Sequence, residues 1–325
     1  MPSPRTVDMH AHVLSPKLVE LTSRAPSRDA NPHNEFLMQS RYKRMFESLD
    51  VRIETMDREG IDMQVVSHMP NYAYWADREL SEQIVEAANT AVQHVCQSNP
   101  ERFVGLAFVS LQFPDLAARQ LEGAMSSSGA FKGVEISSNV QGLDLDDERF
   151  EPFWAAAEQH GALVFIHPSG TTLGDRVAKY YLANIIGNPL DTTLALTHII
   201  FGGVLERHPR LKILGAHGGG YLPSYCSRSD HGYEVRPEAQ TIPSPPSHYV
   251  RRLWVDNLMY NAFNLAHLIA QVGASQVVLG TDYPFDMGQE NPVEIVDGVA
   301  GLSEGDKQQI KRDNAVGLLG LTAAR

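Results

Sequence analysis

Two histidines lie two residues apart near the start of the chain, in Asp8-Met9-His10-Ala11-His12. They end an apolar segment typical of a β-strand, where side chains at positions i and i+2 point to the same face. Imidazole is the commonest side-chain ligand of metal ions, so this pair could hold a cation. The pair alone is a weak signal, because the chain contains 13 histidines.

Three further polar residues end or follow later apolar segments: His167, His217 and Asp282. Imidazoles together with a carboxylate form a ligand set suited to Zn²⁺, with Mn²⁺, Fe²⁺ or Co²⁺ as substitutes. We therefore predict one zinc ion per chain, and its ligands are His10, His12, His167 and Asp282. The alternative is a set of buried histidines that bond to backbone carbonyls, with an aspartate that caps a turn.

His217 differs from the other candidates because it opens a Gly218-Gly219-Gly220 turn. Glycines let a substrate approach the backbone closely, so we predict that His217 is the general acid/base beside the metal. Asp282 could also relay a proton. A second metal would need a bridging lysine or glutamate at the end of the fourth apolar segment. Glu135 lies within that segment and Lys132 precedes it, which favours a single metal.

These residues need elements that bring distant parts of the chain together. Eight short strands alternate with segments of helical periodicity, which predicts a parallel (β/α)8 TIM barrel. The expected strands are Val7–His12, Met63–Ser67, Phe103–Ala107, Gly133–Ile136, Leu163–His167, Lys212–Ala216, Trp254–Asp256 and Val277–Gly280. The expected helices are Leu80–Gln97, Leu116–Ser126, Phe150–Gln159, Leu190–Glu206, Leu265–Gln271 and Glu304–Leu318. The rival doubly wound sheet would need a Gly-rich turn after its first strand.

No domain linker interrupts this alternation, which predicts one domain over residues 1–325, and the connection between the first and second strands is long. All five candidate side chains fall at the carboxyl ends of their strands, where the sites of barrel enzymes lie. The long connections that follow these strands would form loops around the same rim.

Composition excludes several classes of partner. The 27 Lys and Arg residues and 39 Asp and Glu residues give a net charge of −12, which disfavours binding to nucleic acid. The longest apolar runs are too short to span a membrane. The first residues, MPSPRT, lack the regions of an export signal, and the two cysteines form no CxxC motif. We therefore expect a cytoplasmic protein.

The ordered motifs resemble the amidohydrolase superfamily, and more narrowly its branch that contains aminocarboxymuconate-semialdehyde decarboxylase. The matching segments are DMHAH, VRIETMDREGID, PERFVGLAFV, FIHP, AHGGG, PPSHYVRRLWVD, LGTDYPF and DNAVGLLGL, which together span nearly the whole chain. The resemblance implies a barrel with a small insertion after the first strand. It also implies one zinc ion, whose ligand roles fall on His10, His12, His167 and Asp282. The family's sixth-strand histidine corresponds to His217.

The resemblance also implies roles for two arginines. Arg52 matches a residue that clamps a substrate carboxylate, and Arg228 matches one that reaches the neighbouring site across a homodimer interface. A guanidinium group can hold both oxygens of a carboxylate at once. Each arginine could instead form an ion pair on a helix surface.

Members of the branch that act on aminocarboxymuconate semialdehyde read His-Pro-Trp-Asp after the fifth strand, whereas this chain reads His167-Pro168-Ser169-Gly170. The pocket wall therefore differs, and the substrate could be another ring-cleavage product or an aromatic acid. Related resorcylate decarboxylases generally have glutamate in place of the first histidine of the pair. Retention of His10 favours the muconate-semialdehyde side of the family.

The leading hypothesis is a metal-dependent, non-oxidative decarboxylase of a small unsaturated or aromatic carboxylic acid. The second is a metal-dependent hydrolase of a lactone, amide or ring-cleavage product, which would use the same ligands. A third is a barrel that binds a carboxylated metabolite without catalysis.

Overall fold

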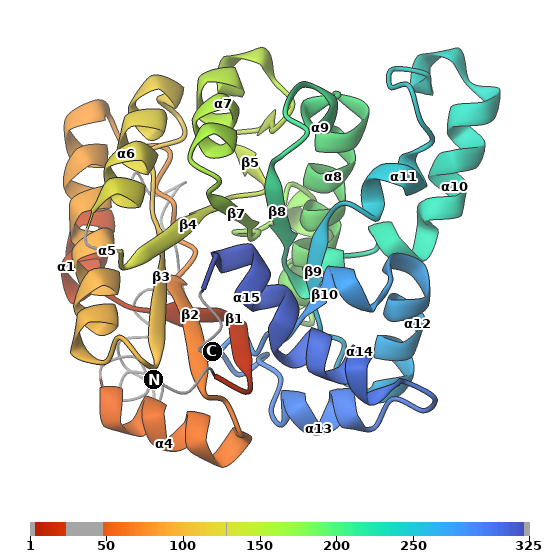
Figure 1. Cartoon of the computed structure of the whole chain (residues 1–325). Coiled ribbons are helices and arrows are strands. Elements are labelled where there is room, and N and C mark those ends of the chain that lie inside the picture. The colour runs from red at the N-terminus through yellow and green to blue at the C-terminus, as the bar shows by residue number, and fades with distance from the viewer. Residues whose placement is uncertain (1–3, 24–47, 128, 322–325) are drawn as a thin grey trace.

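The computed structural model describes residues 4–23, 48–127 and 129–321. Its main sheet has eight parallel strands in the order β1-β2-β3-β4-β7-β8-β9-β10, which confirms the predicted TIM-barrel fold (Figure 1). The strands are β1 (Val7–Val13), β2 (Met63–His68), β3 (Phe103–Ala107), β4 (Phe131–Ile136), β7 (Leu163–Ile166), β8 (Lys212–Gly215), β9 (Trp254–Asp256) and β10 (Val277–Val278). Each expected strand lies within two residues of the observed one.

The last strand is short, yet the chain beyond it runs along β1 and nearly closes the barrel. Isolated bridges join Asp8 to Leu279 and Ala11 to Tyr283. The amide of Met9 donates to the Leu279 carbonyl over 2.8 Å, and the amide of His12 donates to the Tyr283 carbonyl over 2.7 Å. This contact places the residues after β10 beside the histidine pair of β1.

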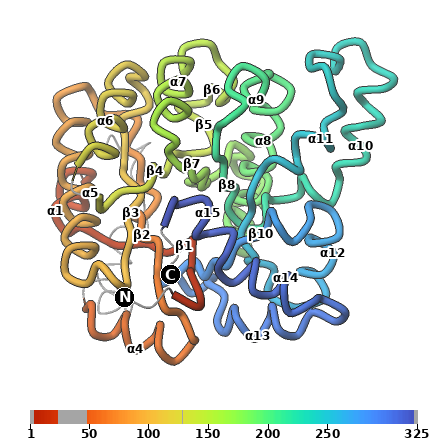
Figure 2. The backbone as a smooth tube through the Cα atoms, in the orientation of Figure 1, coloured from red at the N-terminus to blue at the C-terminus, as the bar shows by residue number. Residues whose placement is uncertain are grey.

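Helices surround the strands (Figures 1 and 2). They are α1 (Pro16–Thr22), α4 (Leu49–Glu59), α5 (Arg78–Ser98), α6 (Pro114–Ser126), α7 (Glu151–Gln159), α8 (Asn188–Phe201), α9 (Val204–Arg207), α10 (Leu222–Val235), α11 (Pro246–Val250), α12 (Ala262–Val272), α13 (Pro292–Asp297), α14 (Glu304–Gln308) and α15 (Asn314–Leu319). A hairpin of β5 (Asn139–Val140) and β6 (Leu143–Asp144) follows β4. The expected insertion after the first strand contains α1 and α4, and its residues 24–47 lie outside the described part of the chain.

Two expected helices are interrupted. The segment Leu190–Glu206 divides into α8 and α9 because Gly203 adopts a left-handed conformation, with φ of 70°, which a right-handed helix cannot continue. The segment Glu304–Leu318 contains a π-helical turn, Gln309–Asp313, between α14 and α15. Both interruptions depend on local backbone geometry that apolar periodicity does not report.

The inside of the barrel is a packed apolar core. Alternate residues of the strands form this core, and three residues of α15 cover it at one end. The core residues are Val7, Met9, Met63, Val65, Val104, Leu106, Leu163, Phe165, Leu214, Ala216, Val278, Ala315, Leu318 and Leu319. Lys212 at the start of β8 donates to the Leu318 carbonyl over 2.9 Å and ties α15 to the strands. In the described residues, no helix is both long and apolar enough to cross a membrane.

Candidate metal centre

The histidine pair faces the barrel axis because β1 contains a bulge. The register of β1 against β2 shifts between Asp8 and Ala11. Val7 and Met9 pack into the barrel interior, whereas Ala11 and Val13 pack toward the surrounding helices. An extra residue in a strand moves the following side chains to the other face. The bulge therefore lets His10 and His12 continue the inward-facing row above the apolar core.

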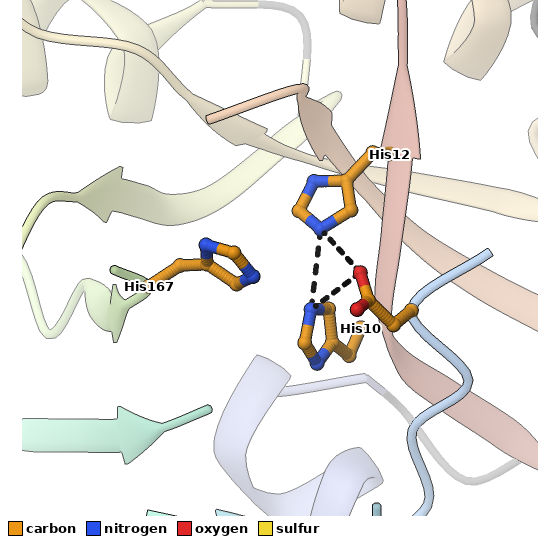
Figure 3. A group of neighbouring side chains, drawn as sticks. His10, His12 and His167 are labelled. Atoms are coloured by element: carbon orange, nitrogen blue, oxygen red, sulfur yellow. Dashed lines mark hydrogen bonds and ion pairs between the residues drawn. The ribbon is translucent and has the colours of Figure 1, made fainter. Parts of the chain in front are cut away.

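The four predicted metal ligands meet at this rim. One donor atom from each of His10, His12, His167 and Asp282 lies within 4.8 Å of the other three, and all four residues are buried. The Nε2 atoms of His10 and His12 are 3.1 Å apart. Asp282 Oδ1 lies 3.3 Å from the first and 3.2 Å from the second. Figure 3 shows the three imidazoles converging on one point.

Each imidazole uses its Nδ1 atom for a contact away from that point. His10 Nδ1 lies 2.8 Å from Asp256 Oδ2, His12 Nδ1 lies 3.2 Å from Ser67 Oγ, and His167 Nδ1 lies 2.8 Å from the Pro168 carbonyl. An acceptor at Nδ1 fixes the tautomer whose Nε2 lone pair is available to a metal. The surroundings thus orient all three rings as ligands.

The donor atoms fit a divalent cation in spacing and in bonding. Metal–nitrogen bonds of about 2.0–2.1 Å at a tetrahedral ion separate neighbouring donors by about 3.3 Å. The donor atoms of His10, His12 and Asp282 are 3.1–3.3 Å apart, and that of His167 lies within 4.8 Å of them. His167 Nε2 and Asp282 Oδ1 are buried, and neither has a hydrogen-bond partner in the described part of the chain. Buried polar atoms without partners are costly, so these two atoms need a ligand.

The charges also favour a cation. Burial opposes protonation of His10, but the carboxylates of Asp282 and Asp256 outweigh it and raise the pKa of His10 to about 10. Burial and the neighbouring imidazole of His217 hold the pKa of His167 well below its usual value, which keeps that ring neutral. The carboxylates of Asp282 and Asp256 thus favour positive charge at the centre, whether it is a proton on His10 or a metal ion.

His217 adjoins the four ligands. Its Nε2 lies 3.6 Å from Asp282 Oδ2, and its ring centroid is 5.0 Å from that of His167. Its Nδ1 is buried and has no partner in the described residues. His217 and Asp282 both have positive φ, 55° and 59°, a strained state that is frequent at functional sites.

Comparison with known families matches residues 7–321 to the amidohydrolase family. The chain is also 36% identical over 275 residues to the 2-amino-3-carboxymuconate-6-semialdehyde decarboxylase of Dictyostelium discoideum, covering 84% of this chain and 76% of the relative. The chain belongs to the amidohydrolase family.

Solved structures agree with this assignment. The 5-carboxyvanillate decarboxylase of Sphingomonas paucimobilis is 25% identical to this amidohydrolase, has a TM-score of 0.85, and is matched over 98% of this chain and 100% of its own. The enzyme of the same name from Novosphingobium aromaticivorans is 22% identical, with a TM-score of 0.88 over 97% and 96% of the two chains, and was solved with manganese and a nitrobenzoic acid. The second likeness supports the fold alone.

Asp256, at the end of β9, organises the amidohydrolase site although the sequence analysis gave it no role. It is fully buried, and its Oδ2 accepts from the His217 amide over 2.9 Å while its Oδ1 accepts from the Gly218 amide over 2.8 Å. With its contact to His10, one carboxylate fixes both a ligand and the candidate acid/base. Burial would raise its pKa, but the bond to His10 lowers it. An acidic residue at the carboxyl end of a barrel strand is the signal that could have identified it.

The two arginines lie in different surroundings. Arg52, on α4, is 2% exposed and donates to Gln64 Oε1 over 2.9 Å and to the His12 carbonyl. Its guanidinium lies 4.6 Å from the centre of the Tyr283 ring. The alternative of a surface ion pair is therefore wrong for Arg52, which lies directly behind a metal ligand. Arg228 is exposed on α10. Substrate binding by either arginine stays a prediction.

His68, at the end of β2, has a structural role. It is buried, with Nδ1 2.9 Å from the Met69 carbonyl, and its Nε2 accepts from the Ser15 amide over 3.1 Å. Ser15 caps α1. His68 thus joins the start of that helix to the barrel wall.

Burial lowers the pKa of His68 to about 4, below about 6.5 in the unfolded chain. Between these two pH values the folded protein binds fewer protons than the unfolded chain. The contribution of neutral His68 to the free energy of unfolding is therefore complete above about pH 6.5 and declines as the pH falls. When the pH is lowered from 7 to 5, the unfolding free energy should fall in both proteins. We expect the fall to be smaller in His68→Gln than in wild type, by on the order of 1–2 kcal/mol. Denaturant unfolding at both values measures this. His231→Gln, an exposed substitution on α10, should follow wild type, and equal losses in wild type and His68→Gln would contradict the prediction.

Proposed function

We propose that the protein is a metal-dependent decarboxylase that acts without oxygen on a small unsaturated or aromatic carboxylic acid. The observation that carries the proposal is the convergence of three imidazoles and one carboxylate at the rim of the barrel. A relative that is 36% identical is a decarboxylase of 2-amino-3-carboxymuconate-6-semialdehyde. We also propose one functional domain over residues 1–325, located in the cytoplasm. The two buried free cysteines agree with a reducing compartment.

His10, His12, His167 and Asp282 would hold the ion, for which the mixed nitrogen and oxygen donors favour Zn²⁺, with Mn²⁺, Fe²⁺ or Co²⁺ as substitutes. When bound, a divalent ion supplies positive charge that polarises the substrate. Asp282 has a second oxygen directed to His217, so it can hold a ligand position and still orient the neighbouring imidazole.

The reaction needs one proton at the carbon that loses its carboxylate. The C–C bond breaks, its electron pair stays on the conjugated skeleton, CO₂ leaves, and a proton replaces it. His217 is the candidate donor because it adjoins the ligands, has a buried nitrogen without a partner in the described residues, and is held by Asp256 through its backbone amide. Asp282, whose Oδ2 lies 3.6 Å from His217 Nε2, is the candidate relay that would pass a proton from solvent to His217.

The decisive experiment is anaerobic incubation of the metal-loaded protein with 2-amino-3-carboxymuconate semialdehyde and with dihydroxybenzoates. We expect stoichiometric release of CO₂, and none from protein treated with a chelator. An acid product without CO₂ would overturn the proposal and favour hydrolysis of a lactone or amide.

Arg52 and Arg228 are proposed to bind substrate carboxylates, the second across a homodimer interface. Arg228 is exposed on α10, and the same helix carries exposed Tyr225 and Val235. Mixing Arg228→Ala subunits with subunits inactivated by His217→Asn tests this arrangement. If the site is shared, each hybrid dimer contains one complete site and recovers about half of the activity of a wild-type dimer. No recovery in a mixture that contains hybrids would contradict sharing.

A further inference from the structure

Glu135 is a buried carboxylate inside the barrel that does not belong to the ligand set. It lies on β4 between Val134 and Ile136, which pack toward the surrounding helices. Side chains alternate along a strand, so Glu135 faces the barrel axis, as the metal ligands do. It is 1% exposed. A carboxylate in this position is costly unless something compensates for its burial.

Only one oxygen of Glu135 has a conventional partner in the described residues. Oε1 accepts from the Tyr72 hydroxyl over 2.7 Å. Oε2 is buried without a hydrogen-bond partner in that part of the chain and lies 3.7 Å from His12 Nδ1. The same nitrogen lies 3.2 Å from Ser67 Oγ, which is also 3.3 Å from the Ala11 carbonyl. His12 Nδ1 therefore faces two oxygen atoms, Ser67 Oγ and Glu135 Oε2.

This arrangement selects one tautomer of His12. The ring offers Nε2 to the metal only when the hydrogen is on Nδ1. Oxygen acceptors around Nδ1 favour that form. A hydrogen-bond donor in place of Oε2 would favour the other tautomer, in which the hydrogen occupies Nε2 and blocks the ligand position.

We propose that Glu135 is a positioning residue that, together with Ser67, holds His12 in its metal-binding tautomer and orientation. Tyr72 fixes Glu135 in turn, because its hydroxyl contacts both Oε1 and the His167 carbonyl, over 2.7 and 3.0 Å. Tyr72 and Glu135 thus connect the backbone carbonyl of His167 to the ring of His12, through hydrogen bonds of Tyr72 and the 3.7 Å contact of Glu135 Oε2. The proposal rests on the metal site of the proposed function but is independent of the reaction catalysed there.

The test is the affinity of Glu135→Gln for Zn²⁺ and Mn²⁺, measured by competition with a chromophoric chelator. Glutamine keeps the size of the side chain and an oxygen for Tyr72 but can present an amide hydrogen to His12. We expect affinity to fall about 10- to 100-fold, as for other residues that orient metal ligands. Asp191→Asn is the matched control, since Asp191 is another buried carboxylate, on α8 and outside the ligand set. It should bind metal as wild type does.

Thermal unfolding of the metal-free proteins separates positioning from a general structural role. Glu135→Gln removes a buried ionisable group, so its metal-free midpoint should equal or exceed that of wild type while the upward shift on adding Zn²⁺ shrinks. Ser67→Ala provides a second route if Glu135→Gln does not fold, with an expected loss of affinity of several-fold. Wild-type affinity in Glu135→Gln, or in Ser67→Ala when only that variant folds, would overturn the proposal. So would an equal loss of affinity in Asp191→Asn. Because metal binding is the readout, an absence of CO₂ release would not affect this result.

Discussion

Asp282→Ala is expected to yield protein with less than about a tenth of a metal ion per chain and no measurable turnover. Asp282 supplies the only carboxylate of the ligand group, and its Oδ1 lies within 3.3 Å of the Nε2 atoms of both His10 and His12. Its loss leaves three neutral imidazoles and removes the negative charge closest to the ion. The free energy of metal binding comes from the bonds between the ion and its ligands, so loss of the one charged ligand in this group should release the metal.

Elemental analysis of purified protein, paired with the CO₂ assay, measures this effect. Asp286→Ala is the control, because Asp286 is an exposed carboxylate in the same loop after β10. It should retain about one ion per chain. Full metal content in Asp282→Ala would contradict the assignment of Asp282 as a ligand.

His217→Asn should separate metal binding from turnover. We expect turnover to fall by about 10²- to 10⁴-fold, the usual contribution of a general acid or base, while the metal content stays at about one ion per chain. Asparagine is the suitable replacement because residue 217 has φ of 55°, and asparagine tolerates positive φ better than most residues. A loss of metal parallel to the loss of turnover would contradict the assignment of His217 as acid/base and make it a ligand.

The control for His217→Asn is His94→Asn, at an exposed position on α5. This variant should keep both wild-type turnover and wild-type metal content. The comparison excludes a general effect of removing one of the chain's 13 histidines. Rescue of His217→Asn by added imidazole would further support proton transfer at this position.

The sequence allowed the barrel to be predicted because each strand is a short apolar segment that is closed by a turn or a polar residue. The ligand group followed from the same rule, since His10, His12, His167 and Asp282 all lie at the carboxyl ends of strands that a closed parallel sheet must bring together. The position of a polar residue along its strand was thus enough to place it at the rim.

The residues behind the ligands could not be found in this way. Asp256 was assigned only as the last residue of a strand, and Glu135 was considered only as a bridging ligand. Their roles arise from contacts with His10 and His12 over sequence separations of more than a hundred residues. Arg52 shows the same limit, because its spacing in a helix gives no sign that it reaches the His12 carbonyl. Such contacts depend on packing between elements, which local periodicity does not encode.

Helix α15 covers one end of the barrel, which limits the paths by which substrate and products can reach and leave the metal ligands. Leu318 and Leu319 join the apolar residues that fill the interior beneath the ligands, so the described residues pack the base of the barrel with apolar side chains. We therefore expect substrate and both products of the proposed reaction to enter and leave at the rim that carries the ligands. The gas is the smaller product and can leave while the organic product is still bound. Release of the organic product would then decide when the next substrate can enter.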